Sequence, residues 1–274
     1  MSPGTKNLLQ RVGTAAVLLP PILWMLFVGG WPAALLFSAA TLLAILEFYR
    51  VALVPERVPG VSTALPIVVA GLLPLLPHGA PGSATALVVA LLFATSVWAW
   101  GTVVFRGDIE AGASRAPMIV EGVVFCALGP FALASLRETS GGAAWVLVLV
   151  AATFSNDAAA YFGGKALGRH KLAPKVSPGK TWEGAFSGAL GSVGAAVGGH
   201  FLWPEVLGWR DVVAIAAVAS VLGPLGDLMK SVLKRAHQVK DAGQILPGHG
   251  GMLDRIDALV VNAPALWVWV TWLR

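Results

Sequence analysis

Residues 84–105 read ATALVVALLFATSVWAWGTVVF, a run that contains no charged side chain. An α-helix of about 20 apolar residues is long enough to cross the hydrocarbon core of a bilayer, so this run predicts a transmembrane helix. The composition of the whole chain agrees, because 57% of its 274 residues are hydrophobic and only 12% are charged. Soluble domains contain about a quarter charged residues. We therefore expect an integral membrane protein.

Eight other segments have a comparable length and apolar character, which predicts an all-α, polytopic transmembrane protein of about nine helices. No tandem repeat or soluble domain is visible. We expect a single integral membrane domain, with N-terminal helices in residues 1–140 and catalytic helices and cytoplasmic loops in residues 141–274. Two prolines in each of the first and third spans predict kinks there. The nine predicted spans are residues 12–28, 31–49, 61–76, 84–105, 117–136, 143–162, 182–203, 211–229 and 256–273.

The basic residues indicate how the spans are oriented. The chain has a net charge of +5, and in membrane proteins Lys and Arg collect in cytoplasmic loops. If the N-terminus is cytoplasmic, sixteen of the nineteen Lys and Arg fall on the cytoplasmic side, and only Arg137, Arg210 and Arg274 fall outside. We therefore expect a cytoplasmic N-terminus and an external C-terminus, and no nucleic-acid partner is needed to explain the positive charge.

Two further features exclude other classes of protein. The first residues, MSPGTKNLLQR, lead into an apolar run without a small-residue cleavage site, so we expect a retained first helix and not a signal peptide. The single cysteine, Cys126, excludes a disulfide within the chain and any zinc site built on cysteines.

Two predicted cytoplasmic segments, 163–181 and 230–255, are longer than a simple connection requires, so the chemistry is expected on the cytoplasmic face. The second lies almost wholly within the sequence SVLKRAHQVKDAGQILPGHGGMLDRID, residues 231–257. A solvated basic loop would explain its cations but not its three aspartates or its Gly-His-Gly-Gly turn. The charged and histidine side chains of this sequence are Lys234, Arg235, His237, Lys240, Asp241, His249, Asp254, Arg255 and Asp257.

The aspartates suggest a metal site. Asp254 and Asp257 are three residues apart on one helix face, and Asp227 lies at the cytoplasmic end of the preceding helix. Carboxylates at membrane depth are costly and usually functional, and several that converge need a cation between them. Oxygen ligands without cysteine favour Mg²⁺, and Mg²⁺ beside Lys and Arg is typical of a phosphate-handling site. An ion or substrate pathway and a structural ion-pair network are the alternatives.

Two upstream clusters point to the same face. Ser155-Asn156-Asp157 places a carboxylate near the cytoplasmic end of the sixth span, where a proton relay or a helix-packing hydrogen bond is also possible. Residues 177–184 contain Gly-Lys-Thr, but Pro174 replaces the first glycine of a P-loop, which we therefore reject. What is left is Lys180 with the hydroxyls of Ser177 and Thr181 at a helix N-terminus, which favours an anion, with a simple N-cap as the alternative. The small residues of 184–199 indicate close helix packing.

Residues 231–257 resemble the signature of the phosphatidate cytidylyltransferase (CDP-diacylglycerol synthase) family, S-x-φ-K-R-x4-K-D-x-small-x2-φ-P-x-H-G-G-φ-x-D-R-φ-D, where φ is apolar. Residues 155–161 and 177–184 also resemble upstream blocks of that family. The resemblance covers about residues 153–257, and the first four spans share only their hydropathy. The matching positions are Ser231, Lys234, Arg235, Lys240, Asp241, Gly243, Leu246, Pro247, His249, Gly250, Gly251, Asp254, Arg255 and Asp257.

The resemblance implies that CTP and phosphatidate react to form CDP-diacylglycerol and pyrophosphate, and that the reaction needs Mg²⁺. Whether one or two metal ions take part is left open. A lipid phosphate oxygen would attack the α-phosphorus of CTP. The nucleophile is already anionic, so positioning and charge stabilisation should dominate catalysis. The implied metal ligands are Asp227 and Asp254, with Asp257 and Asp157 as further candidates. The implied catalytic residues are Lys234, Arg235, Lys240, Asp241, His249 and Arg255, and the implied substrate-binding residues are Ser155, Asn156, Ser177, Lys180, Thr181, Gly250 and Gly251.

His249 would either donate to a phosphate or shape the turn. A CTP-dependent lipid kinase and a transporter that uses intramembrane aspartates are the competing functions, whereas the motif of CDP-alcohol phosphotransferases is absent from the sequence. The expected partners are CTP, phosphatidate and the bilayer. The small-residue faces permit a homodimer, which the resemblance also favours. We expect a multi-pass protein of the cell (plasma or inner) membrane with its active site on the cytoplasmic face.

Overall fold

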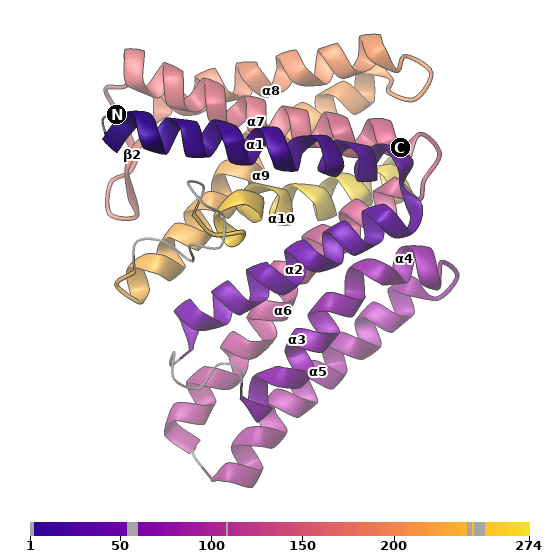
Figure 1. The fold of residues 1–274 in the computed structure, drawn as a ribbon, viewed down its shortest axis with the longest axis vertical. Helices are drawn as coiled ribbons and strands as arrows, with labels where there is room; N and C mark the ends of the chain where they lie inside the picture. The colour runs from indigo at the N-terminus through magenta and orange to yellow at the C-terminus, as the bar shows by residue number, and fades with distance from the viewer. Residues whose placement is uncertain (1–2, 54–59, 108, 240–242, 244–249) are drawn as a thin grey trace. The chain divides into compact units, whose positions relative to one another are not determined.

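The structure is a computed structural model that describes residues 3–53, 60–107, 109–239, 243 and 250–274. The described chain is almost entirely helical (Figure 1) and forms two compact units. The first unit comprises residues 1–134 and 237–255, and the second comprises residues 135–236 and 256–274. The chain therefore leaves the second unit after α9 and returns to it within α10.

The first unit is built around α2. The Tyr49 hydroxyl on α2 donates a hydrogen bond to the carbonyl of Ile119 on α6, at 2.7 Å. Gly122 faces the same ring, where a Cβ would lie 2.3 Å from Tyr49 Cε1, so only glycine lets the two helices come this close. The helices of this unit are α1 (Pro3–Val28), α2 (Gly30–Ala52), α3 (Val61–Leu72), the 3-10 turn η2 (Leu73–Leu75), α4 (Leu76–Gly79), α5 (Ala84–Arg106) and most of α6 (Ile109–Arg137).

The predicted irregularity of the third span is present. α3 ends at Leu72, a 3-10 turn containing Pro74 follows, and α4 then completes the span. Proline lacks the N–H that an α-helix needs in its interior, which explains the change of helix type at this position. By contrast, α1 continues as a helix through Pro20 and Pro21.

The second unit is dominated by α7 and α8, which lie side by side through small residues. A Cβ on Gly191 would lie 2.6 Å from the carbonyl oxygen of Ser155, and one on Gly184 would lie 2.8 Å from that of Ala160. The close packing predicted for residues 184–199 is therefore confirmed. The elements of this unit are α7 (Gly142–Leu167), β1 (Lys171–Ala173), β2 (Ser177–Thr181), α8 (Trp182–Leu202), α9 (Trp209–Ala236), most of α10 (Leu253–Val268) and the π-helical turn η3 (Trp269–Leu273).

The all-α, polytopic fold is confirmed. Each of the nine predicted spans falls on helical structure, although α1, α6 and α9 extend well beyond the predicted bounds. Eight of the described helices are long and apolar enough to cross a membrane. The apolar part of α1, Ala16–Val28, is shorter. Exposed apolar side chains follow one face of α5 at helical spacing, as in Val89, Phe93 and Val97, which suits contact with lipid chains. The β1–β2 hairpin was not predicted.

A buried carboxylate ties the C-terminus to α9 within the second unit. Asp211, 3% exposed, accepts hydrogen bonds from the Gly208 N–H and the Trp269 indole N–H, both at 2.9 Å. The Arg274 guanidinium forms an ion pair with it at 3.3 Å and also lies over the Trp145 ring, 5.0 Å from its centroid. These contacts fix the end of the chain without involving any predicted site residue.

Candidate active site

Two of the predicted metal ligands meet where α9 and α10 approach each other in the second unit. Asp227 is on α9 and Asp257 is on α10. A Cβ on Gly226 would lie only 2.4 Å from the Asp257 carbonyl oxygen, and one on Gly223 would lie 3.1 Å from Asn262 Nδ2. These two glycines belong to the sequence Gly-Pro-Leu-Gly-Asp, residues 223–227, and they allow near-backbone contact between the helices at the level of the two carboxylates.

A buried lysine joins these carboxylates. The Lys230 ammonium lies 3.2 Å from Asp227 Oδ1 and donates a hydrogen bond to Asp257 Oδ2. Lys230 is 5% exposed and Asp257 is 7% exposed. Charges with so little access to water are tolerated when they are paired and hydrogen-bonded. Lys230 is thus the internal counter-ion of both aspartates.

The β1–β2 hairpin supplies a second cation. Lys180, on β2, places its ammonium 2.7 Å from Asp227 Oδ2. The strands are antiparallel, with Lys171 opposite Thr181, and the hairpin leads directly into α8 (Figure 1). Asp227 is therefore held by Lys180 from one side and by Lys230 from the other, and the cluster of two aspartates and two lysines is formally neutral.

The N-cap interpretation of Thr181 is confirmed. Its hydroxyl oxygen accepts a hydrogen bond from the Gly184 N–H at 3.1 Å, which satisfies a free donor in the first turn of α8. The Glu183 carboxylate accepts from the Arg169 N–H at 3.1 Å and from the His170 N–H, and it contacts His170 Nδ1 at 2.6 Å. These contacts attach the start of the hairpin to α8 and so help to position Lys180. Ser177, the other predicted hydroxyl, is half-buried on β2.

The cluster on α7 is divided between packing and surface. Asn156 is 2% exposed and donates a hydrogen bond from Nδ2 to the Ser192 hydroxyl at 3.0 Å, so it joins α7 to α8. Ser155 is half-buried and its backbone faces Gly191. Asp157 is exposed. Asn156 thus has a helix-packing role, and the substrate-binding roles of Ser155 and Asn156 stay predictions.

The signature segment is described in part. In the last turn of α9, Lys234 is half-buried and Arg235 is exposed. In the first unit, Gly250 has a φ of +78°, a backbone conformation that glycine adopts without strain, and Gly251 is buried. The first turn of α10 follows, with a half-buried Asp254 and an exposed Arg255. Predicted residues outside the described part of the chain are Lys240, Asp241 and His249.

The donor set of the second unit fits Mg²⁺. This ion is usually bound through one or two protein carboxylates, with substrate phosphates and waters completing its shell. Asp227 and Asp257 already share one cation, the Lys230 ammonium, so their carboxylates are close enough to act on a common ion. Over the described residues, no group of three or more His, Cys, Asp or Glu converges on one point. The pair therefore fits an ion that substrate phosphates also bind, and the roles of Asp254 and Asp157 stay predictions.

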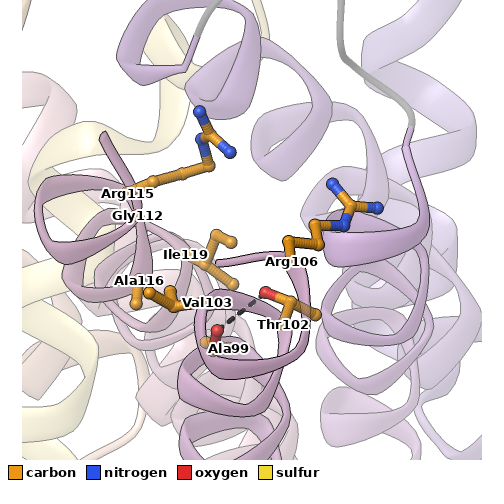
Figure 2. Close-up of a pocket in the computed structure, with 8 residues that line it drawn as sticks. All are labelled: Ala99, Thr102, Val103, Arg106, Gly112, Arg115, Ala116 and Ile119. Atoms are coloured by element: carbon orange, nitrogen blue, oxygen red, sulfur yellow. Dashed lines mark hydrogen bonds between the residues drawn. The ribbon is translucent and has the colours of Figure 1, made fainter. Parts of the chain in front are cut away.

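A small pocket lies elsewhere, between α5 and α6 of the first unit. Figure 2 shows Arg106 and Arg115 above an apolar floor, with the Thr102 hydroxyl donating to the Ala99 carbonyl at 2.8 Å. None of its lining residues belongs to the predicted site. The lining residues are Ala99, Thr102, Val103, Arg106, Gly112, Arg115, Ala116 and Ile119.

Comparison with known proteins confirms the resemblance seen in the signature. The model of the cytidylyltransferase family matches residues 9–273. The chain belongs to the cytidylyltransferase family. It is 37% identical over 273 residues to a phosphatidate cytidylyltransferase of Brucella suis, an alignment that covers 96% of this chain and 93% of that protein. Proteins of the same name match over shorter stretches, in Haemophilus influenzae (39% identical, 55% of this chain and 57% of that protein) and in Thermotoga maritima (40%, 46% and 49%).

Two buried charged residues of this cytidylyltransferase that contact predicted site residues or the signature segment were not predicted from the sequence. Lys230 was counted only as a basic residue of the cytoplasmic side, although its position three residues after Asp227 is the spacing of a helical ion pair. Glu47 on α2, which contacts the signature segment, lies 205 residues before its partner Met252 and has no local sequence signal. Only the first could have been found without the structure.

Proposed function

We propose that the chain transfers the cytidylyl group of CTP to phosphatidate, forming CDP-diacylglycerol and releasing pyrophosphate. Three findings support the proposal: membership of the cytidylyltransferase family across residues 9–273, the names of the relatives, and the complete signature of residues 231–257. The structural observation that best supports this reaction is the cluster of Asp227, Asp257 and Lys230. The β1–β2 hairpin adds Lys180 to this cluster. Carboxylates for a divalent ion and ammonium groups for phosphates lie together there.

In the proposed reaction, a phosphate oxygen of the lipid forms a bond to the α-phosphorus of CTP. The bond between that phosphorus and the bridging oxygen to the β-phosphate breaks, and pyrophosphate leaves with the bonding electrons. Since the nucleophile is anionic, no side chain has to remove a proton. The protein has to hold two anions against their mutual repulsion and to stabilise charge on the leaving group.

The position of each described residue indicates its proposed part in holding the substrates and stabilising charge. Lys180 is presented on a hairpin anchored to α8, so its ammonium can stabilise phosphate charge from a fixed site. Asp227 and Asp257 would hold Mg²⁺, which when bound neutralises phosphate oxygens and polarises the α-phosphate. Lys230 orients both carboxylates from inside the α9–α10 contact. Lys234 and Arg235 follow about two turns after Asp227 on α9 and would contribute further positive charge.

Location and assembly are also part of the proposal. The charge distribution of the loops supports a plasma or inner membrane protein whose active site faces the cytoplasm, where CTP is available. A homodimer is retained as a proposal. Because the small residues of α8 pack on α7 within the chain, a dimer would need another face.

The decisive experiment uses the purified full-length protein in detergent with phosphatidate, Mg²⁺ and CTP labelled with ³²P at the α-position. Label in the lipid phase together with released pyrophosphate is the expected result. Lipid labelled only from CTP carrying ³²P at the γ-position would assign a lipid kinase instead. An absence of labelled lipid from both nucleotides, with folded protein, would favour a transporter. Asp227→Asn serves as the inactive control.

A further inference from the structure

The first unit contains a buried carboxylate that the reaction above does not use. Glu47 lies on α2 and is 0% exposed. Its Oε1 accepts a hydrogen bond from the Met252 N–H at 3.1 Å, and its Oε2 accepts one from the Leu253 N–H at 2.8 Å. These two donors are the backbone groups at the start of α10, immediately before Asp254.

Two glycines of the signature close around the same carboxylate. A Cβ on Gly243 would lie 2.3 Å from Glu47 Oε1, and a Cβ on Gly251 would lie 2.5 Å from Oε2. Neither position has room for a side chain while Glu47 is in place. The carboxylate is therefore enclosed by the backbone of the signature at both of these points, which are separated by seven residues in the sequence.

The physical reason for this arrangement is the helix N-terminus. The first N–H groups of a helix lack intrahelical acceptors and attract negative charge, while a buried carboxylate needs hydrogen-bond donors. Glu47 and the start of α10 satisfy each other, and charge-assisted bonds of this kind are stronger than neutral ones. Because the donors are already bonded to Glu47, the start of α10 is held against α2.

We propose that Glu47 is a positioning residue for cytidylyl transfer. It fixes the signature segment to α2 at Gly243 and at residues 251–253, so that Asp254 and Arg255, which follow in the first turn of α10, have a defined place. The inference rests on the proposed function. It assigns a role in the reaction to the N-terminal helices, which contain none of the signature residues.

The test compares Glu47→Gln with the wild type. The amide keeps the size of the side chain but removes its charge and turns an NH₂ group toward one of the two N–H donors. Ser38→Ala is the matched control, because it removes another buried hydrogen bond of α2, from the Ser38 hydroxyl to the Gly71 carbonyl at 2.6 Å, without touching the signature. Thermal midpoint, amide hydrogen exchange of residues 250–256, and the kcat and KM for CTP are measured for each protein.

We expect Glu47→Gln to accelerate exchange of the Met252 and Leu253 amides about tenfold or more. A displaced catalytic segment should lower kcat by about 10-fold to 100-fold and raise the KM for CTP at least about threefold. Ser38→Ala should lower the thermal midpoint and leave KM unchanged. A purely structural role for Glu47 would only reduce the amount of folded enzyme, which does not alter KM. An unchanged KM for CTP in folded Glu47→Gln therefore overturns the proposal.

A second variant keeps the test decisive if Glu47→Gln does not fold. Glu47→Asp retains the charge but shortens the side chain by one methylene, which should weaken its hydrogen bonds to the start of α10. The variant Gly251→Ala places a Cβ against the Glu47 carboxylate, and the shorter aspartate should relieve that clash. The double variant should therefore regain part of the activity lost in Gly251→Ala. Simple additivity of the two losses would contradict the proposal. If the wild type itself transfers no cytidylyl group, the proposed function fails, while hydrogen exchange still reports whether Glu47 holds α10.

Discussion

Replacing Lys230 by methionine tests the charge cluster most directly. The substitution keeps an unbranched side chain of similar length and removes the ammonium that Asp227 and Asp257 share. Asp257 then has almost no access to water, since it is 7% exposed, and it loses its only cation among the ion pairs described. Asp227 keeps Lys180 at 2.7 Å. The damage should therefore centre on Asp257.

The expected loss follows from burial. Removing one partner of a buried pair destabilises a protein by about 3–5 kcal/mol, because the other charge is left without compensation. For a chain of this size, each kcal/mol changes the melting temperature by about 2–4 °C, so the midpoint should fall by about 6–20 °C in metal-free buffer. Lys165→Met, an exposed lysine in the last turn of α7, is the control and should change the midpoint little.

Mg²⁺ adds a second measurement to this experiment. An ion that binds only the folded state stabilises it by about 2.7 kcal/mol at 100 times its Kd. Titration with Mg²⁺ should therefore raise the midpoint of Lys230→Met more than that of the wild type, in which the ammonium competes for the carboxylates. Adding Asp257→Asn to Lys230→Met should also restore stability, because both charges are then removed. A metal-free midpoint within about 2 °C of the wild type would refute the assigned role of Lys230.

Three further outcomes are expected. Asp254→Asn should abolish turnover while the protein stays folded and membrane-inserted, and near-normal rates at saturating Mg²⁺ would contradict its predicted metal role. Gly226→Ala should lower the free energy of unfolding by about 1–3 kcal/mol and lower activity, because its Cβ would lie 2.4 Å from the backbone of α10. Gly194→Ala is the control, since no atom lies within 4 Å of its Cβ, and it should be neutral or stabilising in the same thermal and activity assays. Arg274→Ala should lower stability by about 1–2 kcal/mol and leave kcat at 25 °C unchanged. It loses one partly exposed ion pair, one ring contact and one exposed hydrogen bond to the Val206 carbonyl. A changed kcat would link the C-terminus to the site.

Hydropathy was sufficient for the helices but not for the connection between α7 and α8. A span is a long, uniform signal, so each predicted span falls on helical structure. The hairpin is short, and its residues, KLAPKVSPGKT, have no regular alternation of apolar and polar side chains. The sequence also predicted an anion-binding helix N-terminus at residues 177–181. The structure shows Thr181 as the N-cap and Lys180 paired with Asp227, and the anion-binding role stays a prediction.

The candidate site was predictable where its residues belong to local patterns. Asp227 and Asp257 stood out because carboxylates are rare in apolar helices, and their meeting follows from the antiparallel course of consecutive helices. That Lys230 also reaches Asp257, 27 residues later, depends on the rotation of α9 about its axis, which the sequence does not specify. The contact of Glu47 with residues 252 and 253 depends on the packing of α2, and hydropathy contains no information on that.

The carboxylates of Asp227 and Asp257 in the second unit and that of Glu47 in the first unit are all buried or half-buried, and their negative charge is balanced in two different ways. In the second unit, Asp227 and Asp257 are balanced by lysine ammonium groups on flexible four-carbon stems, which can turn to another anion without moving the backbone. In the first unit, Glu47 is balanced by backbone N–H groups, which cannot move without moving α10. Exchangeable partners suit carboxylates that, as proposed, would bind a divalent ion together with the nucleotide. Fixed partners suit a carboxylate whose role is to hold a segment in place. This difference is why Mg²⁺ should raise the midpoint of Lys230→Met more than that of the wild type, whereas Glu47→Gln should respond to Mg²⁺ as the wild type does.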